Sequence, residues 1–183
     1  TSSLRRKAQL LAVRPDLDIA DLRGNVNTRI DKLLAGEYDA IILARAGVLR
    51  MGLEEHIAQI IPFDVILPAV GQGAIAIEMR QGDEDTKEII SFLDDAETRA
   101  ATAAERAFLE ALEGGCQVPI GAAAVVDGGT VRLRGFAASL DGNSMFRGEA
   151  EGDVSSPEAV GKNLAADLIS RGADVVLEEI RRA

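Results

Sequence analysis

Two short turn sequences near the C-terminal end constrain the fold of this chain most strongly. The triplets DGG at 127–129 and DGN at 141–143 interrupt a stretch rich in valine, alanine and leucine, residues 121–152. Aspartate and glycine in such positions favour the tight turns that join antiparallel strands. The pattern therefore predicts a sheet of three antiparallel strands.

Helical patterns flank this sheet in the sequence. One occupies 95–113 and ends at the glycine pair Gly114-Gly115, and two more occupy 156–171 and 173–182. Three antiparallel strands with helices packed on one face make a small α+β domain. We place this domain at 95–183.

The first third of the chain alternates between helical and strand patterns. Helical patterns occupy 3–14, 25–37 and 45–53, and continuous or alternating apolar strand patterns occupy 16–22 and 38–44. Alternation of this kind is typical of an α/β domain with a largely parallel sheet. Because "TSSLRR" opens a helix without a preceding strand, we interpret 1–67 as an α/β domain that is incomplete at its N-terminus. The chain is then a fragment of a longer protein.

Residues 68–80 differ in character from the sequence before them. Pro68, Gly71 and Gly73 predict a flexible crossing segment, and 74–79 alternates like a strand. We expect a hinge that passes into another structural unit.

Composition excludes several classes of protein. The net charge is −10, which argues against nucleic acid as a partner. No apolar run approaches the roughly 20 residues of a membrane helix, and no signal-like leader opens the chain. A single cysteine excludes an internal disulfide, and with one histidine it leaves too few ligands for a typical zinc site. We expect a cytoplasmic protein without a structural metal or a membrane partner.

The negative charge is unevenly distributed. Residues 1–67 carry 9 basic and 9 acidic side chains, whereas 68–183 carry 11 and 21. The stretches "TSSLRR", "LRGNVNTR" and "ARAGVLR" each place arginine near a helix N-terminus. A cation there opposes the helix dipole unless an anion shares the site. The pattern predicts a pocket for a small carboxylate ligand. The alternative is that the arginines are solvated or paired with nearby aspartates.

The one cysteine lies in "LEGGCQVPIG", residues 112–121. Cys116 could be a small buried apolar residue in a tight turn, since free cysteine packs in this way. It could also be a nucleophile or a covalent anchor on a mobile loop. The residues of the loop leave both readings open.

The order and spacing of several motifs resemble a known family. The stretches "TSSLRR", "LRGNVNTR", "YDAIILARAG", "LPAVGQGA", "TAAERAFL" and "EGGCQVPIG" are similar to hydroxymethylbilane synthase, also called porphobilinogen deaminase. The resemblance covers essentially the whole chain. It implies an enzyme that condenses four porphobilinogen molecules, with release of ammonia, into hydroxymethylbilane for haem and chlorophyll synthesis. It also implies a monomer of three domains, two of them α/β domains like those of periplasmic binding proteins. By that mapping 1–67 is most of domain 2, 68–94 returns to domain 1 and 95–183 is domain 3.

The resemblance also implies roles for individual residues. Cys116 would hold a dipyrromethane cofactor through a thioether, and the growing polypyrrole chain would be extended from it. Further cofactor-binding positions would be Thr1, Ser3, Arg5, Arg6 and Arg29. Substrate-binding positions would be Arg23, Arg29, Gly47 and Arg50. Arginine guanidinium groups in these positions bind acetate and propionate carboxylates.

The family's catalytic aspartate lies upstream of "TSSLRR". The resemblance therefore implies that this chain contains no catalytic residue, needs an N-terminal part of the same protein and is inactive alone. Two other functions stay open at this point. One is a non-enzymatic ligand-sensing module of the periplasmic-binding type that takes a small carboxylate. The other is a thiol hydrolase, which lacks a marked partner base because His56 is the only histidine.

Overall fold

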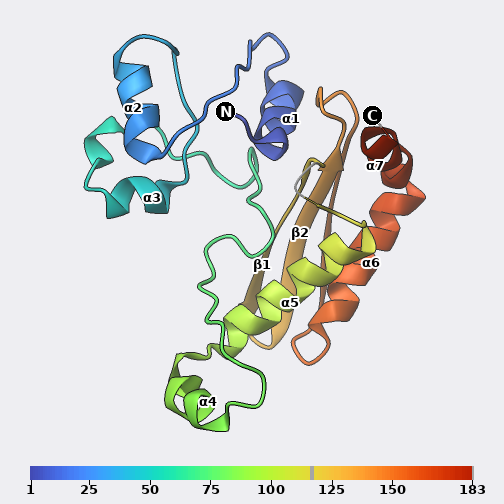
Figure 1. Cartoon of the computed structure of the whole chain (residues 1–183). Helices are drawn as coiled ribbons and strands as arrows, with labels where there is room; N and C mark the ends of the chain where they lie inside the picture. The colour runs from blue at the N-terminus through green and yellow to red at the C-terminus, as the bar shows by residue number, and fades with distance from the viewer. Residues whose placement is uncertain (116–117, 183) are drawn as a thin grey trace.

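The computed structural model describes residues 1–115 and 118–182 (Figure 1). The helices and 3₁₀ turns are α1 (Leu4–Val13), α2 (Val26–Leu34), α3 (Arg45–Arg50), η1 (Glu54–His56), α4 (Glu84–Ile90), η2 (Ser91–Leu93), α5 (Ala96–Ala111), α6 (Pro157–Ser170) and α7 (Ala173–Arg182). The strands are β1 (Ile120–Asp127), β2 (Thr130–Ala138) and β3 (Met145–Asp153). Within the described residues, no helix is both long and apolar enough to cross a membrane.

The C-terminal part confirms the sheet that the turn sequences predicted. The strand order is β1-β2-β3, and both neighbouring pairs are antiparallel. Asp127 pairs with Thr130 across the first turn, and Ala138 pairs with Met145 across the second. In Figure 1, α5 and α6 lie along one face of the sheet, as expected.

The main core lies between the sheet and these helices. Alternate residues of β2, among them Val131 and Leu133, point into it and are fully buried. Glycines allow close packing: a Cβ on Gly135 would lie 2.7 Å from the ring of Phe108, and one on Gly161 would collide with the Ala104 carbonyl oxygen. The sequence therefore uses glycine to bring β2 and α6 against α5.

The other face of the sheet carries the N-terminal part. Ala8 of α1 and Leu67 are buried against Phe136 and Ala138, which alternate with the core residues along β2. Three hydrogen bonds of Arg147 reinforce this contact, to the carbonyl oxygens of residues 64 and 65 and to the side chain of residue 9. Thus β2 separates the main core from the N-terminal part.

The expected helices of the N-terminal part form, but the expected strands do not. The side chain of Asn25 caps α2, and Gly36, with a φ of 77°, follows the last turn, as predicted. Neither 16–22 nor 38–44 is a strand, so the prediction of a parallel sheet within 1–67 is wrong for this structure. A strand requires a neighbouring backbone ladder. Here the backbone at Leu22 bonds instead to the Ser2 hydroxyl.

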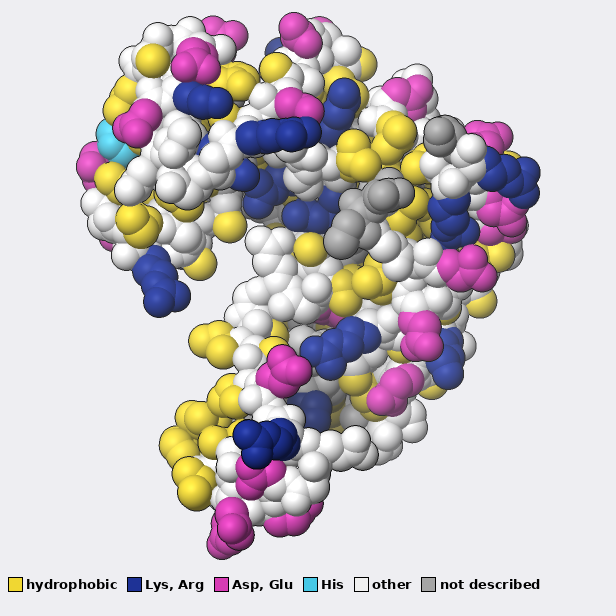
Figure 2. Space-filling model, in the orientation of Figure 1, with side chains coloured by type: hydrophobic (Ala, Val, Ile, Leu, Met, Phe, Trp, Pro, Cys, Tyr) yellow, Lys and Arg dark blue, Asp and Glu magenta, His cyan; other side chains and the backbone are white. Residues whose placement is uncertain are grey.

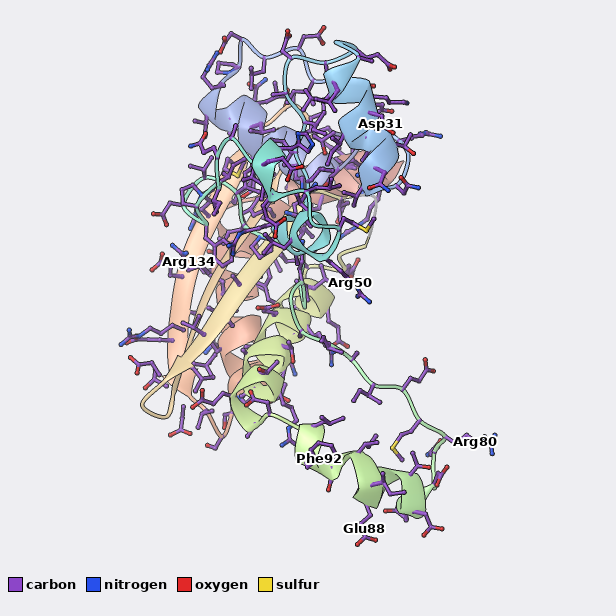
Figure 3. All side chains as sticks on the ribbon, turned by 90° about the vertical axis from the view of Figure 1, so that its left-hand side faces the viewer. Asp31, Arg50, Arg80, Glu88, Phe92 and Arg134 are labelled. Carbon is purple, nitrogen blue, oxygen red and sulfur yellow. The ribbon has the colours of Figure 1, made fainter. Side chains whose placement is uncertain are left out.

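The predicted strand at 74–79 is also absent. Its apolar side chains are exposed instead of buried, with Ile75 at 93% and Ile77 at 51% exposure. Phe92, which follows α4, is 81% exposed, and Figure 3 shows it between α4 and the lower end of α5. The alternating pattern indicated a buried partner that this part of the structure does not supply.

Candidate functional site

The site is built at the start of α1. Ser3 is the N-cap residue, and its hydroxyl accepts a hydrogen bond of 3.4 Å from the backbone N–H of Arg6. The Thr1 hydroxyl accepts one of 3.3 Å from the N–H of Ser3. The first turn of α1 contains no acidic residue, although acidic side chains normally stabilise this position. The positive end of the helix is therefore left with two arginines.

Arg5 is half-buried and bonded only to neutral groups among the described residues. Its Nη1 donates to the Leu67 carbonyl oxygen at 2.6 Å, and its Nη2 donates to Gln72 Oε1 at 3.4 Å. Burial, together with the neighbouring charge of Arg6, lowers the pKa of Arg5 to about 10. Arg5 therefore stays charged at neutral pH, but its charge is poorly solvated.

Arg6 resembles Arg5 in its surroundings. Its Nη1 donates to the Ile42 carbonyl oxygen at 2.8 Å. Burial lowers its pKa, and the charge of Arg29 lowers it further. Arg29 itself donates from Nε to the Gly24 carbonyl oxygen at 2.7 Å. Arg5, Arg6 and Arg29 thus form a cluster of positive charge that joins the starts of α1 and α2.

No ion pair links this cluster to a carboxylate within residues 1–115 and 118–182. Of the N-terminal arginines in that range, Arg14 alone is paired, with Asp16 at 2.7 Å. Pairing with nearby aspartates therefore does not explain the three clustered arginines. A half-buried cation with neutral partners is suited to binding an anion, because a carboxylate restores the lost solvation.

A cavity of about 540 Å³ adjoins the cluster. Arg5, Arg6 and Arg45 contribute to its wall, and most of the remaining lining is apolar, from α2, 39–44 and 57–66. In Figure 2, dark-blue basic side chains gather near the middle of the upper part of the molecule. The cavity thus combines an apolar wall with a cationic edge.

The predicted site residues are only partly gathered. Arg23 is exposed, and neither it nor Arg50 lines the cavity. Arg50 is also exposed and points outward from the end of α3 in Figure 3. Gly47 lies within α3, where an added Cβ would meet only Val26, at 3.5 Å. Cys116 lies outside the described residues. The roles of all these positions stay predictions.

Two residues that support the site had no assigned role in the sequence. Gln9 is fully buried; its Nε2 donates to the carbonyl oxygens of Arg5 and Leu67, and its Oε1 accepts from the Leu67 N–H. Glu105 is buried in α5 and accepts from the backbone of two other segments. A polar residue within an apolar helical stripe was the available signal in both cases.

His56 does not have the surroundings of a catalytic base. It lies in η1, and its Nε2 is 3.6 Å from Glu55, a side chain that is 64% exposed. The ring also contributes to the largely apolar wall of the cavity. These contacts give no support to a thiol hydrolase.

Two family models match the chain. Residues 1–88 match the porphobilinogen deaminase, dipyromethane cofactor binding domain, and 100–170 match the porphobilinogen deaminase, C-terminal domain. The chain belongs to the porphobilinogen deaminase family. The family resemblance read from the motifs is therefore confirmed, and so is dipyrromethane as the cofactor of the matched domain.

Curated porphobilinogen deaminases from several bacteria are about half identical to the chain. The relative from Carboxydothermus hydrogenoformans is 52% identical over 182 residues, which are 100% of this chain and 58% of the relative. The relative from Rubrobacter xylanophilus is 54% identical, with 99% of this chain and 58% of the relative covered. The relative from Chlorobium chlorochromatii is 50% identical, with 100% of this chain and 59% of the relative covered. The chain thus spans less than two thirds of these porphobilinogen deaminases, and no comparison supports a ligand-sensing module.

Proposed function

We propose that this chain is the cofactor- and substrate-binding part of a hydroxymethylbilane synthase. That enzyme joins four porphobilinogen molecules, releases ammonia at each step and yields hydroxymethylbilane. One observation carries the proposal: Arg5 and Arg6 are half-buried, and their guanidinium groups donate hydrogen bonds only to neutral oxygens among the described residues. The pair lies within the segment that matches the cofactor-binding family model.

The residues present fit the dipyrromethane cofactor. Its side chains are acetates and propionates, and the clustered guanidinium groups of Arg5, Arg6 and Arg29 are suited to carboxylates. The hydroxyls of Thr1 and Ser3 flank them at the start of α1. Cys116 would provide the covalent attachment through its sulfur. When bound, the cofactor supplies the primer on which the pyrrole chain is built.

The protein side chains would bind and orient carboxylates. Because the pKa of Arg5 is about 10, its guanidinium is fully charged at neutral pH and needs no proton transfer to bind an anion. The apolar part of the cavity excludes water from the rings, which strengthens these charge contacts. We assign Arg23, Arg29, Gly47 and Arg50 to the substrate on the family pattern.

The division into 1–67, 68–94 and 95–183 forms part of the proposal. Family models that stop at 88 and resume at 100 support a boundary in that region. The exposed side chains of Ile75 and Ile77 support the idea that 68–94 joins a further unit. We propose a periplasmic-binding-like arrangement for 1–67 once that unit is present, and a cytoplasmic monomer overall.

Porphobilinogen carries the same acetate and propionate groups as the cofactor, so titration of the chain with it, followed by calorimetry, probes the carboxylate site at Arg5. We expect saturable binding that Arg5→Gln weakens about ten-fold or more, since hydrogen bonds to charged groups contribute about 1.5–3 kcal/mol. Arg132→Gln is the matched control, because Arg132 is an exposed arginine paired with Glu151. Equal affinity of the two variants would contradict the assignment of Arg5.

Intact mass with Ehrlich's reagent tests the covalent attachment. A colour-forming adduct on the chain that Cys116→Ser lacks would support this cysteine as the anchor, whereas an unmodified thiol is compatible with a cofactor-free fragment. An adduct that persists in Cys116→Ser would rule out this cysteine as the anchor. Turnover is a separate test: we expect that this chain alone consumes no porphobilinogen, and robust consumption would refute the proposal that the aspartate of a further segment is required.

A further inference from the structure

Glu105 is the one buried charged side chain in the described part of the molecule, with 8% of its surface exposed. It lies on α5, and its carboxylate binds two separate segments. Oε2 accepts a hydrogen bond of 2.6 Å from the Gly71 N–H, and Oε1 accepts one of 2.8 Å from the Ala124 N–H. Burial of a carboxylate is costly unless it is hydrogen-bonded. The Gly71 and Ala124 amides, which compensate this cost, therefore show which two segments the Glu105 carboxylate holds in place.

The first partner is a loop and the second is the free edge of the sheet. Ala124 lies in β1, which has β2 on one side only. The neighbouring outward-facing amide of β1, that of Ala122, bonds to the Pro68 carbonyl oxygen at 3.2 Å. The loop 67–72 and Glu105 together thus occupy the edge where another strand would otherwise pair. The loop is fixed to the C-terminal domain at both Pro68 and Gly71.

The same loop holds the guanidinium of Arg5. Leu67, at its start, accepts from Nη1, and Gln72, at its end, accepts from Nη2. The Gln72 side chain also accepts from the Ala69 N–H at 3.1 Å, which closes the loop on itself. Because Gly71 directly precedes Gln72, the bond from Gly71 to Glu105 sets where the Gln72 side chain begins.

We propose that Glu105 is a positioning residue for the carboxylate site at Arg5. By holding Gly71, it fixes the loop 67–72, and through Leu67 and Gln72 the loop fixes the direction of the Arg5 guanidinium. This proposal rests on the proposed function of Arg5 as a carboxylate-binding residue. It connects the core of the C-terminal domain to the ligand site through two hydrogen bonds, from Gly71 to Glu105 and from Arg5 to Gln72, joined by the peptide bond between residues 71 and 72.

Glu105→Gln tests the proposal with little change of shape. The amide has one acceptor oxygen in place of two, so either Gly71 or Ala124 loses its partner. Glu110→Gln is the matched control, since Glu110 lies on the same helix and is exposed. In the 183-residue chain we expect Glu105→Gln to raise the Kd for porphobilinogen about ten-fold, and Glu110→Gln to leave it unchanged. If the Kd of Glu105→Gln equals that of the wild type, Glu105 is merely structural and the proposal is wrong.

A second measurement does not depend on ligand binding. The ¹⁵N NMR signal of the Arg5 guanidinium should shift in Glu105→Gln and in Gln72→Ala, which breaks the same connection at an exposed residue. It should not shift in Glu110→Gln. An unmoved Arg5 signal in Gln72→Ala and Glu105→Gln overturns the positioning role, whether or not porphobilinogen binds. Failure of the wild-type chain to bind porphobilinogen, with the shifts present, overturns the proposed function of Arg5 instead.

Discussion

Residues 1–67 and 118–182 differ in what most of their buried or bonded arginines contact. In the C-terminal region most arginines pair with carboxylates, among them Arg134 with Asp64 at 2.5 Å and Arg171 with Asp167 at 3.0 Å. Arg147 is the exception, because it bonds to carbonyl and amide oxygens of the N-terminal part. In the N-terminal region Arg5 and Arg6 contact carbonyl and amide oxygens only, within the described residues. The difference indicates that Arg5 and Arg6 are kept available for an anion, whereas the paired arginines of the second region stabilise the fold.

The two regions also differ in their cores. The main core joins α5, α6, α7 and the sheet in one cluster of buried side chains. The buried apolar residues Leu22, Ile30 and Val48 of the first region belong to neither cluster found in the described residues. Because burial of apolar surface is the main source of stability, the C-terminal region should carry most of it.

Truncation of one large core residue in each region is the strongest test of this difference. Phe108 is fully buried between the helices and the sheet. We expect Phe108→Ala to lower the free energy of unfolding by about 3–5 kcal/mol. Ile30 is buried but adjoins the cavity, so Ile30→Ala should lower it by about half as much or less. Urea denaturation followed by circular dichroism measures both.

Equal losses for Phe108→Ala and Ile30→Ala would break the comparison, because they would mean that the two regions unfold as one unit with a shared core. The same experiment is sharpened by hydrogen exchange. For the backbone amides of β2, the free energy of opening should be close to the free energy of global unfolding. The amides of α2 should exchange through local opening at a lower free energy.

Glycine positions give a second, smaller contrast. A methyl group on Gly161 would collide with the backbone of α5 at Ala104, so Gly161→Ala should lower the free energy of unfolding by about 1–3 kcal/mol. Gly47 has room for a Cβ within α3, so Gly47→Ala should leave stability unchanged or raise it by up to about 1 kcal/mol. Thermal denaturation of both variants checks this. A Gly161→Ala variant as stable as wild type would show that α6 can shift away from α5 at little cost.

The contrast between regions also explains what could be predicted from the sequence. Each strand of the C-terminal sheet pairs with its neighbour in sequence, so the turns at 127–129 and 141–143 were sufficient to predict it. The expected strands at 16–22 and 38–44 needed partners that local pattern cannot supply, and they did not form. A strand prediction is thus most secure where the ladder is local.

The candidate site follows the same rule. The arginines at the starts of α1 and α2 could be found, because a cation in a first helical turn is visible in the sequence. For Glu105 the apolar helical stripe around it was a signal, but its bond to Gly71 could not be predicted, because the two residues lie 34 positions apart. Likewise, the contact of Gln72 with Arg5 could not be predicted, because the two residues lie 67 positions apart. Long-range hydrogen bonds between loops leave no periodic signal.

The pH dependence of stability tests the buried carboxylate that joins the regions. Burial raises the pKa of Glu105 above its ordinary value of 4.5, although bonds from Gly71 and Ala124 and the charge of Arg106 oppose this shift. The folded state therefore binds more protons than the unfolded state in the interval above 4.5. It follows that this group's contribution to stability is complete below 4.5 and is lost as pH rises through the folded pKa.

Urea denaturation across that interval, for wild type and Glu105→Gln, measures the effect. Because Glu105→Gln has no titrating carboxyl group at this position, its free energy of unfolding should decline less steeply with rising pH than that of the wild type. Glu110→Gln, with the exposed carboxylate of the same helix removed, should keep the wild-type slope. Parallel curves for wild type and Glu105→Gln would show that Glu105 titrates as it does in the unfolded chain.

The smallest expected effect comes from the exposed ion pairs of the sheet. Arg132 lies 3.5 Å from Glu151 and 3.9 Å from Asp127, and all three side chains are more than half exposed. Arg132→Gln should lower the free energy of unfolding by less than about 1 kcal/mol, and high salt should remove the difference. Arg134→Gln is the variant to compare with it, since Arg134 forms an ion pair with Asp64 of the first region. If urea denaturation shows a larger loss for Arg134→Gln, ion pairs across the two regions contribute more than those within one. A larger loss for Arg132→Gln would mean that docking of the N-terminal region depends on Leu67 and Gln9 rather than on charge.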